Sequence, residues 1–519
     1  MVKKFDLAIV GSGFAGSLLA MIAHRLGYSV VLLEKSRHPR FAIGESSTPL
    51  ANLLLEELST RYDLPRLLPL SKWGSWQRHY PKIACGLKRG FSFFHHHYGQ
   101  PFTDDAQRSN QLLLAASPHN EIADTHWYRP DFDHFFVREA QSLGVEYWDE
   151  VALQNMCLRD DGVLLNGVRH GEPVSVRARF VVDATGPRGF IHQKSGLQEK
   201  PLEHLPGTQA LYSHFTGVKR LDEMGIYSEH EPPYLVDDAA VHHVFDGGWI
   251  WVLRFNNGIT SAGVAATDAL AEELQFEDGA AAWDRLLKKL PTVHEQFSDA
   301  APQMPFVHAK RLAFQSETVV GKRWALLPSA AGFIDPLLST GFPLTLLGVA
   351  RLAEVMEHDW ESCEFATRLK TYEAQTHAEL NATERLIAAL YSCMSDFSLF
   401  VPMSMLYFTA ATYTETARRL DRSHLAGLFL MHNHPVFGPA LAACCEKASQ
   451  WSNATASPVQ KQQFVAQIMR TIEPFNVAGL GRPHLRNWYP VDASDLLDAA
   501  PKLSANRQEI EQLLARCGF

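Results

Sequence analysis

The sequence has 519 residues, and its 48 Lys and Arg against 57 Asp and Glu give a formal net charge of −9. Hydrophobic residues make up 46% and charged residues 20%, which excludes a disordered or fibrous chain. At roughly 150 residues per domain, the length predicts about three structural units. The mild acidity argues against a broad basic surface, so we expect no nucleic-acid partner.

The cysteines and the apolar stretches bear on disulfides, metal sites and membrane-spanning segments. The seven cysteines are an odd number without Cys-x-x-Cys spacing, so neither a disulfide framework nor a zinc site is predicted, and we expect no metal. The most lipophilic late stretch, residues 399–411, contains Pro402 and is shorter than the ~20 residues that a spanning helix needs. We therefore expect no transmembrane segment and a soluble, cytoplasmic protein.

The chain divides into three regions with different sequence patterns. Residues 1–200 and 300–358 alternate short β-branched runs with helical patterns and glycine turns, which predicts a parallel sheet with crossover helices. A loop insertion is expected in this unit at about 81–119. Residues 201–299 contain short aromatic strands, as in GWIWVLRF, which predicts an inserted antiparallel sheet. Residues 359–519 have helical spacing. The predicted class is α/β, α+β overall, with a helical C-terminal region.

The N-terminal segment FDLAIVGSGFAGSLLAMIAHRLGYSVVLLEK has the parts of a βαβ nucleotide-binding unit. Gly11 permits the tight turn, Gly13 lets a pyrophosphate approach the backbone, and Gly16 lets helix and strand pack closely. The start of the helix presents free N–H groups to phosphate. Glu34 ends the second strand, where an acid can accept hydrogen bonds from a ribose.

Two later loops bear on which dinucleotide is bound. Residues 178–187 (ARFVVDATGP) and 324–341 (WALLPSAAGFIDPLLSTG) are each a strand followed by small residues and an acid. This arrangement resembles the FAD-binding fold of the aromatic hydroxylase superfamily. That family's Gly-Asp-Ala is replaced here by Pro-Ser-Ala at 328–330, so a usual carboxylate contact to the ribityl chain is missing. The resemblance implies FAD, held by Gly11, Gly13, Phe14, Ala15, Gly16, Glu34, Lys35, Arg40, Ser46, Ser47, Arg129, Asp183, Gly186, Asp335 and Gly341.

Four stretches resemble the flavin-dependent halogenases: residues 39–49 (PRFAIGESSTP), 86–94 (GLKRGFSFF), 124–133 (DTHWYRPDFD) and 332–341 (GFIDPLLSTG). The second resembles the segment that supplies the family's active-site lysine, which implies Lys88. The last resembles the loop where characterised members hold a halide. It implies a chloride or bromide site at the backbone N–H groups of Thr340 and Gly341.

The halogenase resemblance implies that reduced FAD, oxygen and halide give hypohalous acid, which reaches the substrate through Lys88. Lys88 would hydrogen-bond the oxidant or carry it as a chloramine, and the second role needs a pKa lowered by burial. Without the resemblance, the alternative is a solvated surface lysine beside Arg89.

Two departures from the halogenase pattern bear on substrate and reaction. The family's Trp-x-Trp-x-Ile-Pro is here Trp249-Ile250-Trp251-Val252-Leu253, which keeps both tryptophans and loses Ile-Pro. Leu338 stands where tryptophan halogenases carry a glutamate, so we expect a phenol, pyrrole or lipophilic molecule and not free tryptophan. The expected substrate pocket comprises Phe93, Trp249, Trp251 and Leu338, although aromatic residues at strand spacing are also typical of core.

Three readings stay open. The first is a halogenase acting on an electron-rich, non-tryptophan small molecule. The second is an FAD-dependent monooxygenase or dehydrogenase without halide use, and the third is a non-catalytic flavin-binding protein. The sequence has one glycine motif, so reduced FAD is expected to come from a separate flavin reductase.

Overall fold

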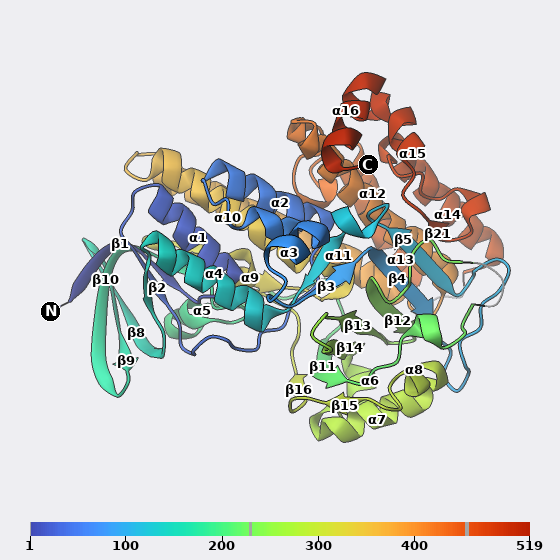
Figure 1. Ribbon diagram of the computed structural model, residues 1–519, viewed down its shortest axis with the longest axis horizontal. Coiled ribbons are helices and arrows are strands. Elements are labelled where there is room, and N and C mark those ends of the chain that lie inside the picture. The colour runs from blue at the N-terminus through green and yellow to red at the C-terminus, as the bar shows by residue number, and fades with distance from the viewer. Residues whose placement is uncertain (1, 228–230, 452–455) are drawn as a thin grey trace.

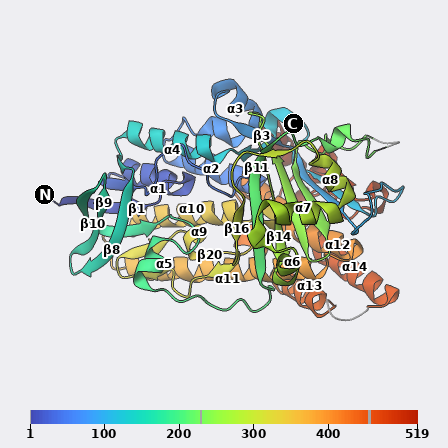
Figure 2. The same cartoon turned by 90° about the horizontal axis from the view of Figure 1, so that it is seen from below.

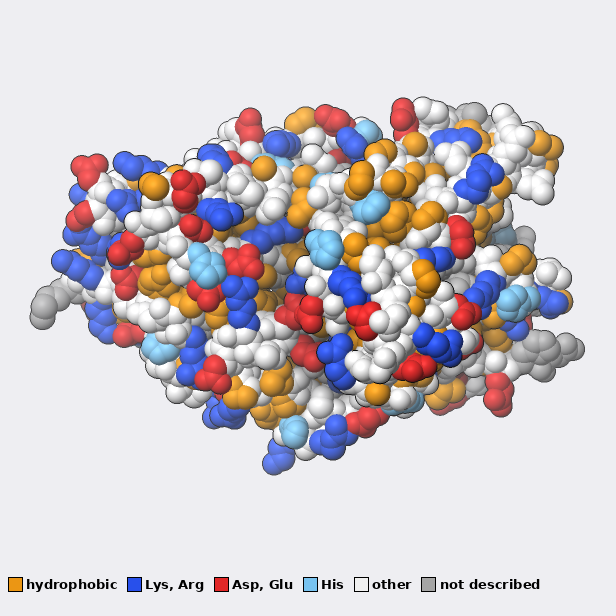
Figure 3. All heavy atoms as spheres, turned by 90° about the horizontal axis from the view of Figure 1, so that it is seen from above, with side chains coloured by type: hydrophobic (Ala, Val, Ile, Leu, Met, Phe, Trp, Pro, Cys, Tyr) orange, Lys and Arg blue, Asp and Glu red, His pale blue; other side chains and the backbone are white. Residues whose placement is uncertain are grey.

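The computed structural model describes residues 2–227, 231–451 and 456–519. Two sheets lie at opposite ends of the long axis, and helices from the C-terminal third pack beside the second sheet (Figure 1). The view from below shows the second sheet between short helices on its outer face and the long C-terminal helices (Figure 2). Figure 3 shows charged side chains of both signs interspersed over one face, as the near-balanced composition leads one to expect.

The first sheet has a parallel centre, in which β1 pairs with β2 and β10, β2 with β7, and β10 with β19. β18, β8 and β9 add antiparallel pairs. Its strands are β1 (Lys3–Val10), β2 (Val30–Leu33), β7 (Glu146–Trp148), β8 (Val151–Arg159), β9 (Gly162–Arg169), β10 (Glu172–Asp183), β18 (Val320–Gly321) and β19 (Trp324–Leu326). β2 is wholly buried and the last four residues of both β1 and β10 are buried, as expected where a parallel sheet is covered on both faces.

The helices around this sheet come from several parts of the chain. They are α1 (Phe14–Arg25), α2 (Pro49–Arg61), α3 (Trp73–His79), α4 (Arg129–Leu143), α5 (Phe190–Ser195), α9 (Pro328–Ala331) and α10 (Gly341–Asp359). α1 packs against α4 and α10 and has ten buried residues. The predicted βαβ unit is confirmed, with β1, the glycine turn, α1 and β2 in the expected order.

The second sheet is mixed and draws on four parts of the chain. In order, its main strands are β15 (Ala301–Pro302), β11 (Thr208–Thr216), β14 (Thr260–Thr267), β13 (Gly248–Arg254), β12 (Ala240–Phe245), β4 (Gly90–His95), β5 (Gln111–Ala115) and β21 (Trp488–Tyr489), with β16 (Val307–Ala309) on β11. Three short helices lie near it, α6 (Asp268–Glu273), α7 (Ala280–Lys289) and α8 (Pro291–Gln296).

The segment 81–119, expected as a loop insertion, differs from that expectation. It supplies β4 and β5 to the second sheet, and β4 pairs in parallel with β12. The sheet is therefore not purely antiparallel. Every residue of β4 is buried, so its aromatic side chains complete the core on both faces of the sheet. β3 (Cys85–Lys88) instead pairs with β6 (Asp124–Trp127) in a separate ribbon, and β17 (Phe314–Gln315) pairs with β20 (Gly332–Phe333).

The C-terminal third is helical, apart from β21, which joins the second sheet beside β5. Its helices are α11 (Phe365–Ser392), α12 (Phe397–Arg419), α13 (Phe437–Trp451), α14 (Pro458–Ile472), α15 (Ala493–Asp498) and α16 (Arg507–Cys517). The apolar stretch around Pro402 lies inside α12, where 16 residues are buried against the rest of the protein. Across the described residues, no helix combines the length and apolarity needed to span a bilayer.

Candidate active site

The glycine turn has the geometry that its sequence predicts. Gly11 has a φ of +100°, and a Cβ there would lie 2.6 Å from the Ala184 carbonyl oxygen. A Cβ on Gly16 would collide with the carbonyl oxygen of Gly11, so helix and strand approach closely. A Cβ on Gly13 would point at two guanidinium groups, 3.3 Å from Arg129 Nη2 and 3.9 Å from Arg40 Nη2.

Glu34 is buried and fixed by donors at the end of β2. Its Oε2 accepts hydrogen bonds from Ser12 N at 3.1 Å, Ser12 Oγ at 2.8 Å and Arg40 Nη2 at 3.1 Å, and Ser36 N donates to Oε1 at 2.9 Å. Burial alone would raise the pKa of Glu34, but Arg40 and these hydrogen bonds lower it below its ordinary value. The carboxylate therefore stays ionised at neutral pH, ready to accept from ribose hydroxyls.

Two arginines, Arg129 and Arg40, lie at the start of α1, each paired with a buried carboxylate. Arg129 is bound by both oxygens of Asp133, each at 2.8 Å, and Asp133 Oδ1 also accepts from Phe14 N at 3.2 Å. The Arg40 Nε atom is enclosed and has no hydrogen-bond partner among the described residues. A free guanidinium donor beside a helix N-terminus fits a pyrophosphate, so the observed side chains suit FAD. Asp133 and Ser12 were not among the predicted site residues, because only their contacts with Arg129 and Glu34 mark them.

Other expected cofactor residues are used inside their own loops. Asp183 accepts from Thr185 N and Ile191 N, so both of its oxygens shape the turn that contains Gly186. Ser47 Oγ donates to the Thr125 carbonyl oxygen at 2.7 Å. Lys35 is exposed beside Glu34, and Ala15 is buried in the first turn of α1.

Asp335 is a buried carboxylate that accepts three hydrogen bonds next to the expected halide loop. Its Oδ1 accepts from Leu337 N at 2.9 Å and Trp249 Nε1 at 3.2 Å, and its Oδ2 accepts from the Tyr391 hydroxyl at 2.8 Å. Burial raises the pKa of Asp335 to about 6, against the lowering effect of these three donors. Asp335 thus ties the loop to the second sheet and to α11.

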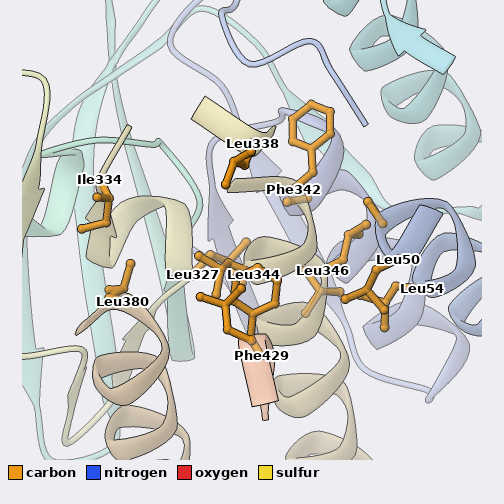
Figure 4. Close-up of a cluster of buried hydrophobic side chains, with 14 of the residues drawn as sticks. Leu50, Leu54, Leu327, Ile334, Leu338, Phe342, Leu344, Leu346, Leu380 and Phe429 are labelled. Carbon is orange, nitrogen blue, oxygen red and sulfur yellow. The ribbon is translucent and has the colours of Figure 1, made fainter. Parts of the chain in front are cut away.

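The turn that follows Asp335 leads into the first residues of α10. Leu338 and Ser339 have positive φ values of 64° and 55°, a conformation that costs energy for residues other than glycine. Leu338 is fully buried beside Phe342 in an apolar cluster (Figure 4). Thr340 and Gly341 line a small cavity of about 30 Å³ with Asp335. α10 is 19 residues long, and the N–H groups at its start favour an anion there.

Lys88 is completely buried, which excludes the solvated surface lysine. Its Nζ donates to Ser46 Oγ at 2.8 Å and to the Ser47 carbonyl oxygen at 2.5 Å, and lies 3.9 Å from the centre of the Phe91 ring. Burial lowers the pKa of Lys88 to about 7, although Asp124 partly opposes that shift. Lys88 therefore joins β3 to the 39–49 loop, next to the expected flavin side.

A cavity of about 160 Å³ lies beyond Phe91. It is enclosed mainly by apolar side chains from β4, β5, α12 and the last sixty residues, among them Phe91, Leu114, Tyr407, Phe408, Leu480 and Tyr489. Thr48 and Pro49, the residues after Ser47, also line it. The cavity therefore borders both Phe91 and the loop that Lys88 holds, and the helical C-terminal region supplies much of its wall.

None of the four expected pocket residues lines this cavity. Phe93 is buried against His242 and Phe400, with ring centroids 4.3 and 5.8 Å away. Trp249 and Trp251 lie on one face of β13, 5.8 Å apart, where the first donates to Asp335 and the second to Ser261. The two tryptophans therefore stay side by side without the Ile-Pro that follows them in the halogenases, but they are part of the hydrophobic core.

Comparison with known proteins gives a consistent result. Residues 109–397 match the family model described as tryptophan halogenase, and residues 9–50 match an NAD(P)-binding Rossmann-like domain. Lys88 falls between the two matches. The monodechloroaminopyrrolnitrin halogenase PrnC of Pseudomonas fluorescens is 30% identical over 77% of this chain and 70% of its own. The tetracycline 7-halogenase of Kitasatospora aureofaciens is 28% identical over 82% and 78%.

The fold comparison extends over most of the molecule. The crystal structure of halogenase PltM in complex with phloroglucinol and FAD superposes with a TM-score of 0.83 at 26% identity. The match covers 93% of this chain and 99% of that one, so it includes the helical C-terminal region.

Proposed function

Because the chain belongs to the tryptophan halogenase family of flavin-dependent enzymes, we propose that it halogenates an electron-rich, non-tryptophan small molecule with chloride or bromide. The observation that carries this proposal is the burial of Lys88 between the 39–49 loop and the cavity wall at Phe91. Related enzymes are named for brominating or chlorinating a pyrrole-2-carbonyl group on a peptidyl-carrier protein and for halogenating tetracycline, and one was crystallised with phloroglucinol. None of these names specifies free tryptophan as substrate.

FAD would be held by the glycine turn, Glu34 and the guanidinium groups of Arg40 and Arg129. When bound in its reduced form, FAD supplies the electrons that activate oxygen, and with halide the product is hypohalous acid. The N–H groups of Thr340 and Gly341 at the start of α10 would hold the halide. With one glycine motif in the sequence, we propose that a separate reductase supplies reduced FAD in the cytoplasm.

The chain's own residues then control transfer to the substrate. Lys88 Nζ binds the hypohalous acid by hydrogen bonding, at the boundary between loop and cavity. The mostly apolar lining of the cavity limits the water that would otherwise compete for the oxidant. A flat phenol or pyrrole suits the aromatic part of its lining, which includes Phe91, Tyr407 and Phe408.

The test is turnover with FAD, a flavin reductase, oxygen and bromide, using a panel of phenols, pyrroles and indoles read by mass spectrometry. We expect a bromide-dependent product from at least one electron-rich ring. Filling the cavity with Ala411→Phe on α12 should raise the KM for that substrate while FAD affinity stays unchanged. Halide-independent oxygenation or desaturation would instead establish the monooxygenase or dehydrogenase alternative.

A further inference from the structure

Lys88 has a buried acidic neighbour that the sequence argument did not use. Lys88 and Asp124 are cross-strand partners at one end of the β3–β6 ribbon, and both side chains are buried. Asn52 on α2 donates to Asp124 Oδ1 at 2.7 Å, whereas Oδ2 is enclosed without a hydrogen-bond partner among the described residues. The position of the carboxylate is thus fixed at one oxygen, and the other is left free.

The remaining ionisable groups around the pair are poor proton carriers. His126 on β6 and His242 on β12 lie near Lys88, and burial lowers the pKa of both, that of His242 to about 3. Tyr407 on α12 lies near Asp124, and burial raises its pKa. Glu415 and Arg419, also on α12, influence Asp124 but neutralise each other through a 2.7 Å ion pair. Among the described residues no direct ion pair joins Lys88 to Asp124, so the buried carboxylate acts on the ammonium across the ribbon through its charge.

We propose that Asp124 is a positioning residue that acts through Lys88, keeping one proton on the pair so that Lys88 is an ammonium donor when hypohalous acid reacts. This inference rests on the proposed function. Burial lowers the pKa of Lys88 and raises that of Asp124, so it disfavours both charged forms, whereas each charge favours the other. The carboxylate opposes the loss of the ammonium form that burial alone would cause.

Halogen transfer takes one proton from Lys88 and returns one proton to it. A ring carbon attacks the halogen of hypohalous acid, the carbon–halogen bond forms and the oxygen–halogen bond breaks. Lys88 gives its proton to the departing hydroxide, which leaves as water, and the ring becomes a cation. The ring then returns its displaced hydrogen, as a proton, to the neutral Lys88 amine. The halogen is reduced, the ring carbon is oxidised, and the pair regains its starting charge.

The test is the pH profile of bromination, with substrate subsaturating, for wild type and Asp124→Asn. Removal of the anion lowers the pKa of Lys88, so we expect the alkaline limb to move down by about one to three pH units. Asn52→Leu, which frees Asp124 Oδ1, should move the limb in the same direction by less. Asp237→Asn is the matched control, since this buried carboxylate pairs with Arg254 and should leave the limb in place.

The outcomes are distinct. If wild type brominates but Asp124→Asn loses activity equally at every pH, the inference is wrong and the proposed function stands. An acid limb that moves down while alkaline activity persists would show that Lys88 acts as a neutral amine, which also contradicts the inference. Additive changes in melting temperature for Lys88→Met, Asp124→Asn and their double variant, at every pH, would contradict charge coupling. A wild type without bromide-dependent product overturns the proposed function and this inference with it.

Discussion

Tyr391 on α11 donates its phenol hydrogen to Asp335 Oδ2 at 2.8 Å, across 56 residues of sequence. Because Trp249 of the second sheet donates to the other oxygen, three parts of the chain meet at one buried carboxylate. The helical C-terminal region is therefore bonded to the loop that leads to Thr340, as well as lining the cavity. Through this contact, the C-terminal region helps to fix the loop that carries the proposed halide site.

Tyr391→Phe should destabilise the protein. It leaves one oxygen of a fully buried carboxylate without its donor, at a cost of about 1–3 kcal/mol. Thermal unfolding should show a lower melting temperature than wild type. Tyr413→Phe, which removes a bond to the Lys502 carbonyl oxygen elsewhere on the helices, is the matched control and should cost less. Equal losses in the two variants would contradict a special role for the Asp335 contact.

Asp335 should make stability depend on pH in a defined direction. Its folded pKa of about 6 is above the ordinary value of 3.8 for an aspartate, so the folded state holds the proton more strongly. The stability of wild type should fall as pH rises from about 4 to 6, and stay level above that. Relative to Asp335→Asn, the fall should amount to about 3 kcal/mol in denaturant unfolding. A difference between the two proteins that is constant over pH 4–7 would disprove this.

The βαβ unit could be predicted because its signals are local. Gly11, Gly13 and Glu34 follow fixed spacings set by one turn and two strands, and the structure has those elements. The β4 and β21 strands could not be placed, because their pairing depends on contacts between distant segments. Trp488, for example, pairs with Leu113.

Local sequence also does not predict which side chains line the cavity. Phe91 and Phe93 lie on one face of β4, as strand alternation predicts, and both rings contact Phe408. Only Phe91 lines the cavity. The difference is set by how α12 packs over the strand, which no local pattern encodes. Lys88 was identified through family resemblance, and its complete burial required the structure.

Gly13→Val should abolish or greatly weaken FAD binding. The added side chain would point at Arg129 Nη2 and Arg40 Nη2, where a pyrophosphate is expected. We expect at least about a tenfold loss of affinity in a flavin thermal-shift titration, equivalent to about 1.4 kcal/mol. Gly171→Asn is the control, since Gly171 lies in a hairpin turn with open space and a φ of +85° that Asn tolerates. Unchanged binding by Gly13→Val, or selective binding of NAD, would contradict an FAD site here.

Free tryptophan should be a poor substrate. Leu338 stands where tryptophan halogenases carry a glutamate, so this position offers no carboxylate to a substrate amine, and an unpaired amine costs about 1–3 kcal/mol or more. In competition between tryptophan and an accepted phenol at equal concentrations, the halogenated phenol should predominate by about tenfold or more. Efficient regioselective halogenation of free tryptophan would refute the expectation drawn from Leu338.

Lys88 is the residue whose replacement separates the leading functions. Lys88→Ala should leave FAD binding and oxygen consumption near wild type and abolish halogenated product, because the oxidant forms but is not delivered. Lys88→Met, which better preserves packing in the fully buried site, should do the same. Lys88→Arg should not restore activity, since a guanidinium stays protonated and cannot exchange the proton. Product mass with and without bromide, at equal flavin occupancy, is the measurement.

If the lysine variants retain most of the bromide-dependent product, Lys88 is not the catalytic residue. If bromide is irrelevant even to wild type, the enzyme is a monooxygenase or dehydrogenase, and the loss of Ile-Pro after Trp251 is the first feature to reverse.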